Sequence, residues 1–143
     1  LGGYFGSRLM SNIREDKGYT YGIYSGLNSM RNGGHFIIST EVGVDVRQAA
    51  IDEIYSEMSR LQEELVDEGE LELVRNYMMG RLQNGLDGPF KVAGMYKGLY
   101  TYDLDIDYLY GLVETINTIT PEQIMDLANR YFDPSTMHEI TVG

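Results

Sequence analysis

The feature that most constrains the fold of this chain is a change of hydrophobic periodicity at Gly18. Before it, Leu9, Met10 and Ile13 share the spacing of one helix face, and after it apolar and polar residues alternate as in a half-buried strand. Glycine tolerates left-handed backbone and so commonly ends a helix. Residues 1–25 therefore predict a short amphipathic helix, a sharp reversal and a strand.

This reversal brings two strong hydrogen-bond donors to one rim of the fold. Arg14 lies in the last turn of the predicted helix, and Tyr21 opens the predicted strand. A guanidinium and a phenol both donate hydrogen bonds, and arginine stays charged at any working pH. The pair can bind a ligand, or Arg14 can merely complement the helix C-terminus while Tyr21 packs at the strand end. Composition and spacing alone favour the second interpretation.

A β-hairpin is predicted next. The Asn-Gly pair at residues 32–33 is a strong turn signal, and we expect strands over Tyr21–Met30 and His35–Val42. A last strand is expected over Met137–Val142. A hairpin, a run of helices and a returning strand indicate an α+β fold in which helices cover one face of an antiparallel sheet.

The helices between these strands are predicted from periodicity and capping residues. The clearest begins after Asp45, its predicted N-cap, with Gln48 at the capping-box position, and it ends near Leu65. Its solvent-exposed face is predicted to carry Asp52, Glu53, Glu57, Glu63 and Glu64. The other helices are expected over Glu70–Asn84, over Pro89–Tyr102, after a cap at Asp105 or Asp107, and from the capping box at Thr120–Gln123 to about Tyr131.

Composition limits the partners of this single-domain-sized chain of 143 residues. A formal charge of −11 argues against binding to nucleic acid or to an anionic membrane surface. No apolar run approaches the length of a membrane span, so we expect no membrane insertion. The absence of cysteine excludes disulfides and thiolate zinc sites, but it does not settle the compartment.

The run S-R-L-M-S-N-I-R-E-D-K-G-Y-T-Y-G at residues 7–22 resembles a known signature. It is similar to the C-terminal, non-zinc half of the pitrilysin/insulinase family of zinc metallopeptidases, which includes mitochondrial processing peptidase. The match covers Gly2 to about Ser25, with weaker support from the tail YFDPSTMHEITVG. The residues in register are Ser7, Arg8, Leu9, Arg14, Glu15, Gly18 and Tyr21. Tyr19 and Thr20 differ from the leucine and alanine often found at their positions.

This resemblance implies a fold, a cofactor and a role for the two donors. Residues 1–143 would form one C-terminal-type inactive domain of the processing-peptidase fold, lacking its first strand and most of its first helix. Zinc would lie on a partner half, bound by an H-x-x-E-H motif, on the same polypeptide or on another subunit. Residues matching Arg14 and Tyr21 bind a substrate backbone carbonyl there and help to stabilise the oxyanion. The resemblance therefore reverses the preference that spacing alone gave.

The expected function is the substrate-binding, non-catalytic half of a zinc-dependent metalloendopeptidase, with a peptide as the substrate. One alternative is a structural scaffold subunit of the same family without a proteolytic role. Another is a generic peptide-binding module that uses an exposed strand edge. Since a missing strand would leave an unpaired edge and an uncovered apolar patch, we also expect self-association of the chain.

We predict that the isolated chain binds no zinc stoichiometrically and cleaves no peptide. Its two histidines, His35 and His138, lie far apart in sequence, and neither lies in a zinc motif. We therefore assign no metal ligand and no catalytic residue to this chain. Metal analysis of the purified chain checks this expectation, and one tightly held zinc ion per chain would contradict it.

Overall fold

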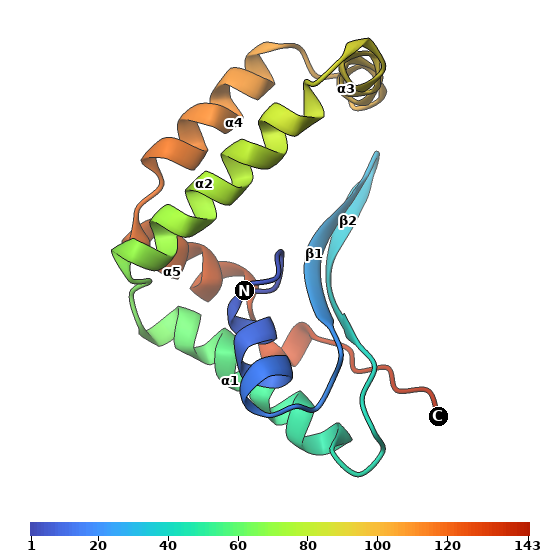
Figure 1. The fold of residues 1–143 in the computed structure, drawn as a ribbon, viewed down its shortest axis with the longest axis vertical. Helices are drawn as coiled ribbons and strands as arrows, with labels where there is room; N and C mark the ends of the chain where they lie inside the picture. The colour runs from blue at the N-terminus through green and yellow to red at the C-terminus, as the bar shows by residue number, and fades with distance from the viewer. The chain divides into compact units, whose positions relative to one another are not determined.

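The computed structural model describes residues 1–143, which divide into two compact units (Figure 1). The first unit comprises Leu1–Glu64 and Met125–Gly143, and the second comprises Leu65–Ile124. One two-stranded antiparallel sheet and several helices make up the fold. The predicted α+β class is therefore confirmed.

The first unit begins with η1 (Met10–Asp16), the short helix expected before Gly18. It is a π-helix, in which the N–H of Lys17 donates to the carbonyl of Asn12 five residues back, at 2.9 Å. Its apolar side is buried as the spacing predicts, and Gly18 has the left-handed φ of 66° that the reversal requires. The wider π form was not foreseen, because hydrophobic spacing over so few residues does not separate it from an α-helix.

The predicted hairpin forms with shifted boundaries. β1 (Ile23–Met30) pairs with β2 (Gly33–Thr40) from Ile23 opposite Thr40 to Met30 opposite Gly33. Both strands therefore end earlier at the open end of the hairpin than predicted, and Tyr21 lies outside the ladder. The turn is centred on residues 31–32, so the glycine of the Asn-Gly pair is the first residue of β2 rather than a central turn residue.

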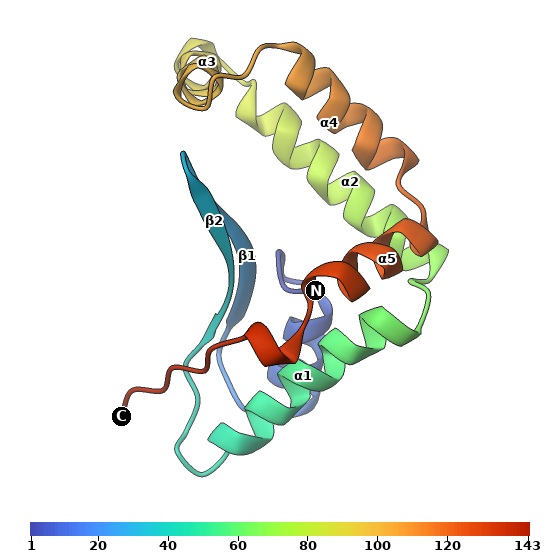
Figure 2. The same ribbon diagram turned by 180° about the vertical axis from the view of Figure 1, so that it is seen from behind.

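The core of the first unit lies where η1 contacts both β1 and α1 (Arg47–Glu63), as Figure 2 shows from behind. Leu9, Met10, Ile13 and Ile23 are buried in it. Ile38 of β2 and Ile54 of α1 pack against this cluster. Hairpin, η1 and α1 are therefore joined by one set of apolar contacts, which fixes where the Gly18 reversal lies.

The predicted cap of α1 is wrong. The helix begins at Arg47 after Val46, and no side chain caps its first N–H groups. Asp45 belongs to the preceding turn, where its carboxylate lies over the backbone of Gly43, and Gln48 donates instead to Asp52 at 3.0 Å. A sequence match to a capping box thus failed because the turn aims Asp45 away from the helix.

In the second unit, α2 (Glu68–Gly85) packs against α3 (Pro89–Thr101) and α4 (Asp107–Thr118). Asp67 caps α2 by accepting from the N–H of Gly69 at 2.8 Å. Of the two candidate caps for α4, Asp105 is the one that accepts, from the N–H groups of Asp107 and Tyr108. Arg75 of α2 donates to the carbonyl of Ile119 just after α4.

The helix α5 (Pro121–Tyr131) begins with the predicted capping box. The N–H of Gln123 donates to the Thr120 hydroxyl at 3.3 Å, and the N–H of Thr120 donates back to the Gln123 side chain at 2.9 Å. Near its other end, Asn129 donates to the carbonyl of Gln62 at 3.0 Å, and this bond ties α5 to the end of α1 within the first unit.

The predicted last strand is wrong. After a single 3₁₀ turn, η2 (Pro134–Thr136), residues 137–143 run without a ladder partner, because β1 and β2 pair only with each other. Glu139 in this tail accepts a hydrogen bond from the Tyr55 phenol, which raises the pKa of Tyr55. The apolar residues of the alternating tail, Ile140 and Val142, stay exposed because no strand pairs with them. None of the helices has the length and apolar character needed to cross a membrane.

We predict that the isolated chain self-associates. The sheet has open edges, and large apolar side chains are solvent-exposed, among them Leu27 at 71%, Phe90 at 92% and Tyr100 at 89%. Sedimentation velocity should show a weight-average mass that rises with protein concentration, and Phe90→Ser with Tyr100→Ser should reduce the rise. A concentration-independent monomer would contradict this expectation.

Candidate functional site

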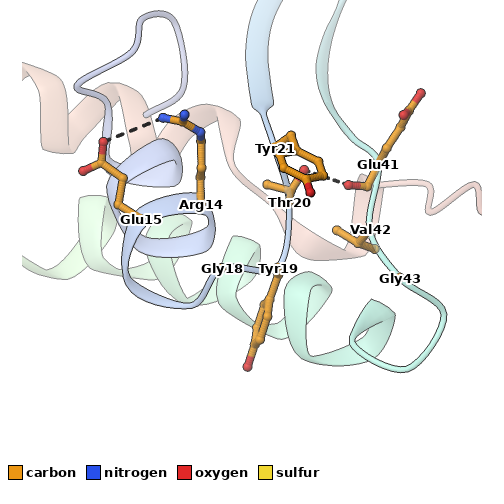
Figure 3. Close-up of a pocket in the computed structure, with 9 residues that line it drawn as sticks. All are labelled: Arg14, Glu15, Gly18, Tyr19, Thr20, Tyr21, Glu41, Val42 and Gly43. Carbon is orange, nitrogen blue, oxygen red and sulfur yellow. Dashed lines mark hydrogen bonds and ion pairs between the residues drawn. The ribbon is translucent and has the colours of Figure 1, made fainter.

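The candidate site is an open hollow at the end of the hairpin opposite its turn (Figure 3). Its volume is about 640 Å³. The segment that connects η1 to β1 forms one side, and the residues that follow β2 form the other. It is lined by Arg14, Glu15, Gly18, Tyr19, Thr20, Tyr21, Glu41, Val42 and Gly43. The structure thus brings both donors predicted from the sequence to one accessible surface.

Arg14 reaches the hollow from the π-helix. Its guanidinium carbon lies 4.6 Å from the centroid of the Phe5 ring, within cation–π distance. One guanidinium nitrogen lies 3.9 Å from the Glu15 carboxylate, and the side chain is 33% exposed. An ion pair this long and this exposed contributes little. The guanidinium is therefore oriented by an aromatic face while its N–H groups stay available to a ligand.

Tyr21 reaches the hollow from the loop between Gly18 and β1. Its side chain is fully exposed, at 101% of the reference area, and its phenol makes no hydrogen bond. In Figure 3 Arg14 turns toward Glu15 and not toward Tyr21. The two donors therefore share the hollow without bonding to each other, and their polar tips are not buried in the helix–sheet core.

A side-chain amide holds the π-helix, and with it Arg14, on α1. Asn12 Nδ2 donates to Glu53 Oε2 at 2.9 Å and to Glu57 Oε1 at 2.8 Å. Glu57 is only 3% exposed, and Arg60 Nη1 is its second partner at 3.2 Å. A buried carboxylate needs such partners, because an unpaired one costs several kcal/mol (about 3–5). Asn12 and Glu57 therefore form a structural anchor for the site.

This anchor was not predicted from the sequence, and the prediction that Glu57 lies on the solvent-exposed face of the helix is wrong, since the residue is buried. A signal was present. Glu57 lies three residues after Ile54 and four before Leu61, so it occupies the apolar face of the helix. An acid at a core position indicates a buried partner elsewhere in the chain, and Asn12 is that partner.

Lys17 extends the same network at the end of η1. Its Nζ lies 3.0 Å from Glu53 Oε1. The hydrogen bond from Asn12, followed by that from Lys17, lowers the pKa of the Glu53 carboxyl below its ordinary value. Reciprocally, the hydrogen bond and charge of Glu53 raise the pKa of Lys17. Both directions favour the charged pair at neutral pH.

The residues of this chain do not fit a catalytic zinc site. No group of three or more histidine, aspartate, glutamate or cysteine side chains lies close enough together to hold a metal ion. His35 lies in β2, where its Nε2 is 3.1 Å from Asn28 Nδ2, and His138 lies in the C-terminal tail. A zinc peptidase needs three convergent protein ligands, so no step of a reaction is assigned to a metal on this chain.

Comparison with known proteins identifies the family. Residues 1–78, more than half of the chain, match the family described as the peptidase M16 inactive domain. This chain therefore belongs to the inactive-domain family of the M16 peptidases. The predicted relation to the C-terminal, non-zinc half of the pitrilysin-type peptidases is thereby confirmed.

Individual relatives agree with this assignment. The chain is 32% identical over 87 residues to the uncharacterized zinc protease YmxG of Bacillus subtilis (strain 168), a match that covers 61% of this chain and 21% of that protein. A peptidase M16 inactive domain from Pseudomonas fluorescens superposes with a TM-score of 0.82 at 25% identity, over 93% of this chain and 32% of the other.

A protease from Helicobacter pylori shares the fold, with a TM-score of 0.83 at 18% identity over 93% of this chain and 32% of the other. The chain thus spans about a fifth of the length of YmxG and about a third of each of these solved chains.

We predict that Glu53→Gln flattens the acid limb of the stability curve. Because folding lowers the pKa of Glu53 from its ordinary value of 4.5, its contribution is fully present above that pH. The contribution is lost as pH falls through the lowered, folded-state pKa. Urea unfolding of wild type and variant from neutral pH into the acid range measures the difference in the free energy of unfolding.

The matched control is Glu114→Gln, which removes an exposed carboxylate of α4 that has no side-chain partner. Its acid limb should parallel that of the wild type. Identical acid slopes in wild type and Glu53→Gln would refute the stabilising role of the Asn12–Glu53–Lys17 contacts.

Proposed function

We propose that this chain is the substrate-binding, non-catalytic half of a zinc-dependent metalloendopeptidase. Residues 1–143 would belong to one C-terminal-type domain of that enzyme, and Arg14 and Tyr21 would donate hydrogen bonds to a backbone carbonyl of the peptide substrate. The observation that supports this most directly is that both donors border one open hollow in a chain of the M16 inactive-domain family.

The chemistry of the two donors suits that role. Hydrolysis of a peptide bond develops negative charge on the carbonyl oxygen, and preorganised donors aimed at that oxygen lower the barrier. Arg14 supplies a permanent positive charge and Tyr21 a neutral hydroxyl. The Phe5 ring holds the guanidinium without consuming its N–H groups. Arg14 is thus oriented before substrate arrives, which is what preorganisation requires.

The remaining chemistry belongs to a partner half. Zinc bound there would supply a water molecule with a lowered pKa as the nucleophile for the peptide carbonyl at neutral pH. We propose that the zinc-bearing half, on the same polypeptide or on another subunit, closes over the rim that carries Tyr21. Full exposure of an aromatic side chain supports this, because such residues contribute most when a ligand or partner covers them.

A scaffold without proteolytic role is the competing function. It gains nothing from two donors that face solvent beside a hollow, whereas a peptide-binding half uses both. The two functions differ in one measurable respect: only the peptide-binding half makes the turnover of the complete peptidase depend on these side chains.

We predict that Arg14→Ala and Tyr21→Phe each lower kcat of the full-length peptidase by ~10²–10³, as loss of one oxyanion donor does. Neither side chain is buried in the core, so the melting temperature should hardly change. Cleavage of a fluorogenic peptide gives kcat, and calorimetry gives the melting temperature. Tyr110→Phe is the control, because it removes an exposed phenol from α4, outside the hollow.

The opposite pattern would refute the proposal. If Arg14→Ala and Tyr21→Phe reduced stability while the folded protein kept its normal turnover, the two residues would be structural and the scaffold function would be favoured.

A further inference from the structure

Two threonine hydroxyls meet beside Tyr21 at the open end of the hairpin. Thr20 Oγ1 lies 2.7 Å from the carbonyl oxygen of Glu41 and 2.9 Å from that of Gly22. Thr40 Oγ1 lies 3.0 Å from the same Gly22 carbonyl and 3.0 Å from Thr20 Oγ1. The N–H of Gly22 donates to Thr20 Oγ1 at 3.1 Å. We call these four residues the threonine clasp.

Counting protons shows that the clasp needs both hydroxyls. Each hydroxyl carries one proton, so each can donate only one full hydrogen bond at a time. If Thr20 donates to the nearer carbonyl, that of Glu41, then Thr40 is left to donate to Gly22. Both carbonyls are then satisfied, and Thr20 still accepts from the Gly22 N–H. Neither threonine alone can serve both carbonyls.

The clasp continues the hairpin beyond its last residue pair. The ladder ends where Ile23 pairs with Thr40, and the clasp connects the next residue outward on each strand, Gly22 before β1 and Glu41 after β2. Figure 3 shows the bond from Thr20 to the Glu41 carbonyl next to Tyr21. The two neighbours of Tyr21 in the chain, Thr20 and Gly22, are therefore both held against the end of β2.

This restraint matters because nothing else fixes Tyr21. Its side chain is fully exposed, so packing does not orient it, and its phenol has no hydrogen-bond partner. The backbone on either side thus sets where the Cα–Cβ bond of Tyr21 starts and points, and the clasp holds that backbone.

We propose that Thr20 and Thr40 are positioning residues that hold Tyr21 at the hollow for substrate binding. This inference rests on the proposed function, because it assigns the clasp to the turnover of the same site. Replacing a clasp hydroxyl by a methyl group leaves the freed carbonyl near the surface, where water can bond it, so the fold should survive. The loop would gain freedom, and a misplacement of ~1 Å in a reacting group can cost ~10²-fold in rate.

The test measures kcat and KM of the full-length peptidase for Thr40→Val and Thr20→Val, which keep the shape but lose the hydroxyl. We expect kcat to fall roughly ten- to a hundred-fold while KM changes little. Thr40→Ser, which keeps the hydroxyl, should restore most of the rate. Thr118→Val is the matched control, because it removes a hydroxyl bonded to a backbone carbonyl at 2.8 Å on α4, and Thr118 is not among the residues that line the hollow.

A double-mutant cycle with Tyr21→Phe separates positioning from general stability. If the clasp acts through Tyr21, then adding Thr40→Val to the Tyr21→Phe variant should lower kcat little further, because the phenol hydroxyl is already absent. Should Thr40→Val fail to fold, Thr20→Ala supports the same cycle, since it also removes a hydroxyl of the clasp.

The outcomes distinguish the two proposals. If Tyr21→Phe lowers kcat but the clasp variants do not, or if their effects multiply independently, the clasp proposal is wrong and the proposed function stands. If Tyr21→Phe leaves kcat unchanged, both are wrong.

Discussion

The rest of this site depends on the buried carboxylate of Glu57, a residue of α1. A buried charge must be paired, and its partners are Arg60 on the same helix and Asn12 on the π-helix. Because Asn12 also donates to Glu53, one amide fixes η1 against two successive turns of α1. Hydrogen bonds to charged groups contribute ~1.5–3 kcal/mol each, so the position of η1 is strongly determined. Arg14, two residues further on, is placed by the same bonds.

The two donors at the hollow are therefore held by different means. Arg14 is part of a helix anchored by charge-assisted bonds and oriented by Phe5. Tyr21 follows the left-handed residue Gly18 and is held only through its backbone neighbours in the threonine clasp. One donor is thus fixed before a ligand arrives, and the other depends on exposed hydrogen bonds. Because of this difference, substitutions should disturb the geometry of the Tyr21 loop more easily than that of the helix that carries Arg14.

Features that depend on neighbouring residues could be predicted from the sequence, whereas features that depend on residues far apart in the chain could not. The capping box at Thr120, the reversal at Gly18 and the cap at Asp105 are decided by neighbouring residues, and all three form. The cap at Asp45 and the last strand failed, because a turn and the absence of a pairing strand outweigh local preference. The Asn12–Glu57 bond joins residues 45 positions apart. Its only signal in the sequence is that Glu57, an acidic residue, occupies the apolar face of its helix. The resemblance at residues 7–22 identified the family, and the reversal at Gly18 explains why Arg14 and Tyr21 border the same hollow.

The central claim is that Arg14 and Tyr21 together hold a substrate carbonyl. A crystal structure of the full-length peptidase with a non-cleavable phosphinic peptide bound tests it most directly. The account predicts one oxygen of the phosphinic group, in place of the scissile carbonyl, within about 3 Å of both the Arg14 guanidinium and the Tyr21 phenol. A bound peptide that leaves the hollow empty, with its reacting group held by other residues, would contradict the account.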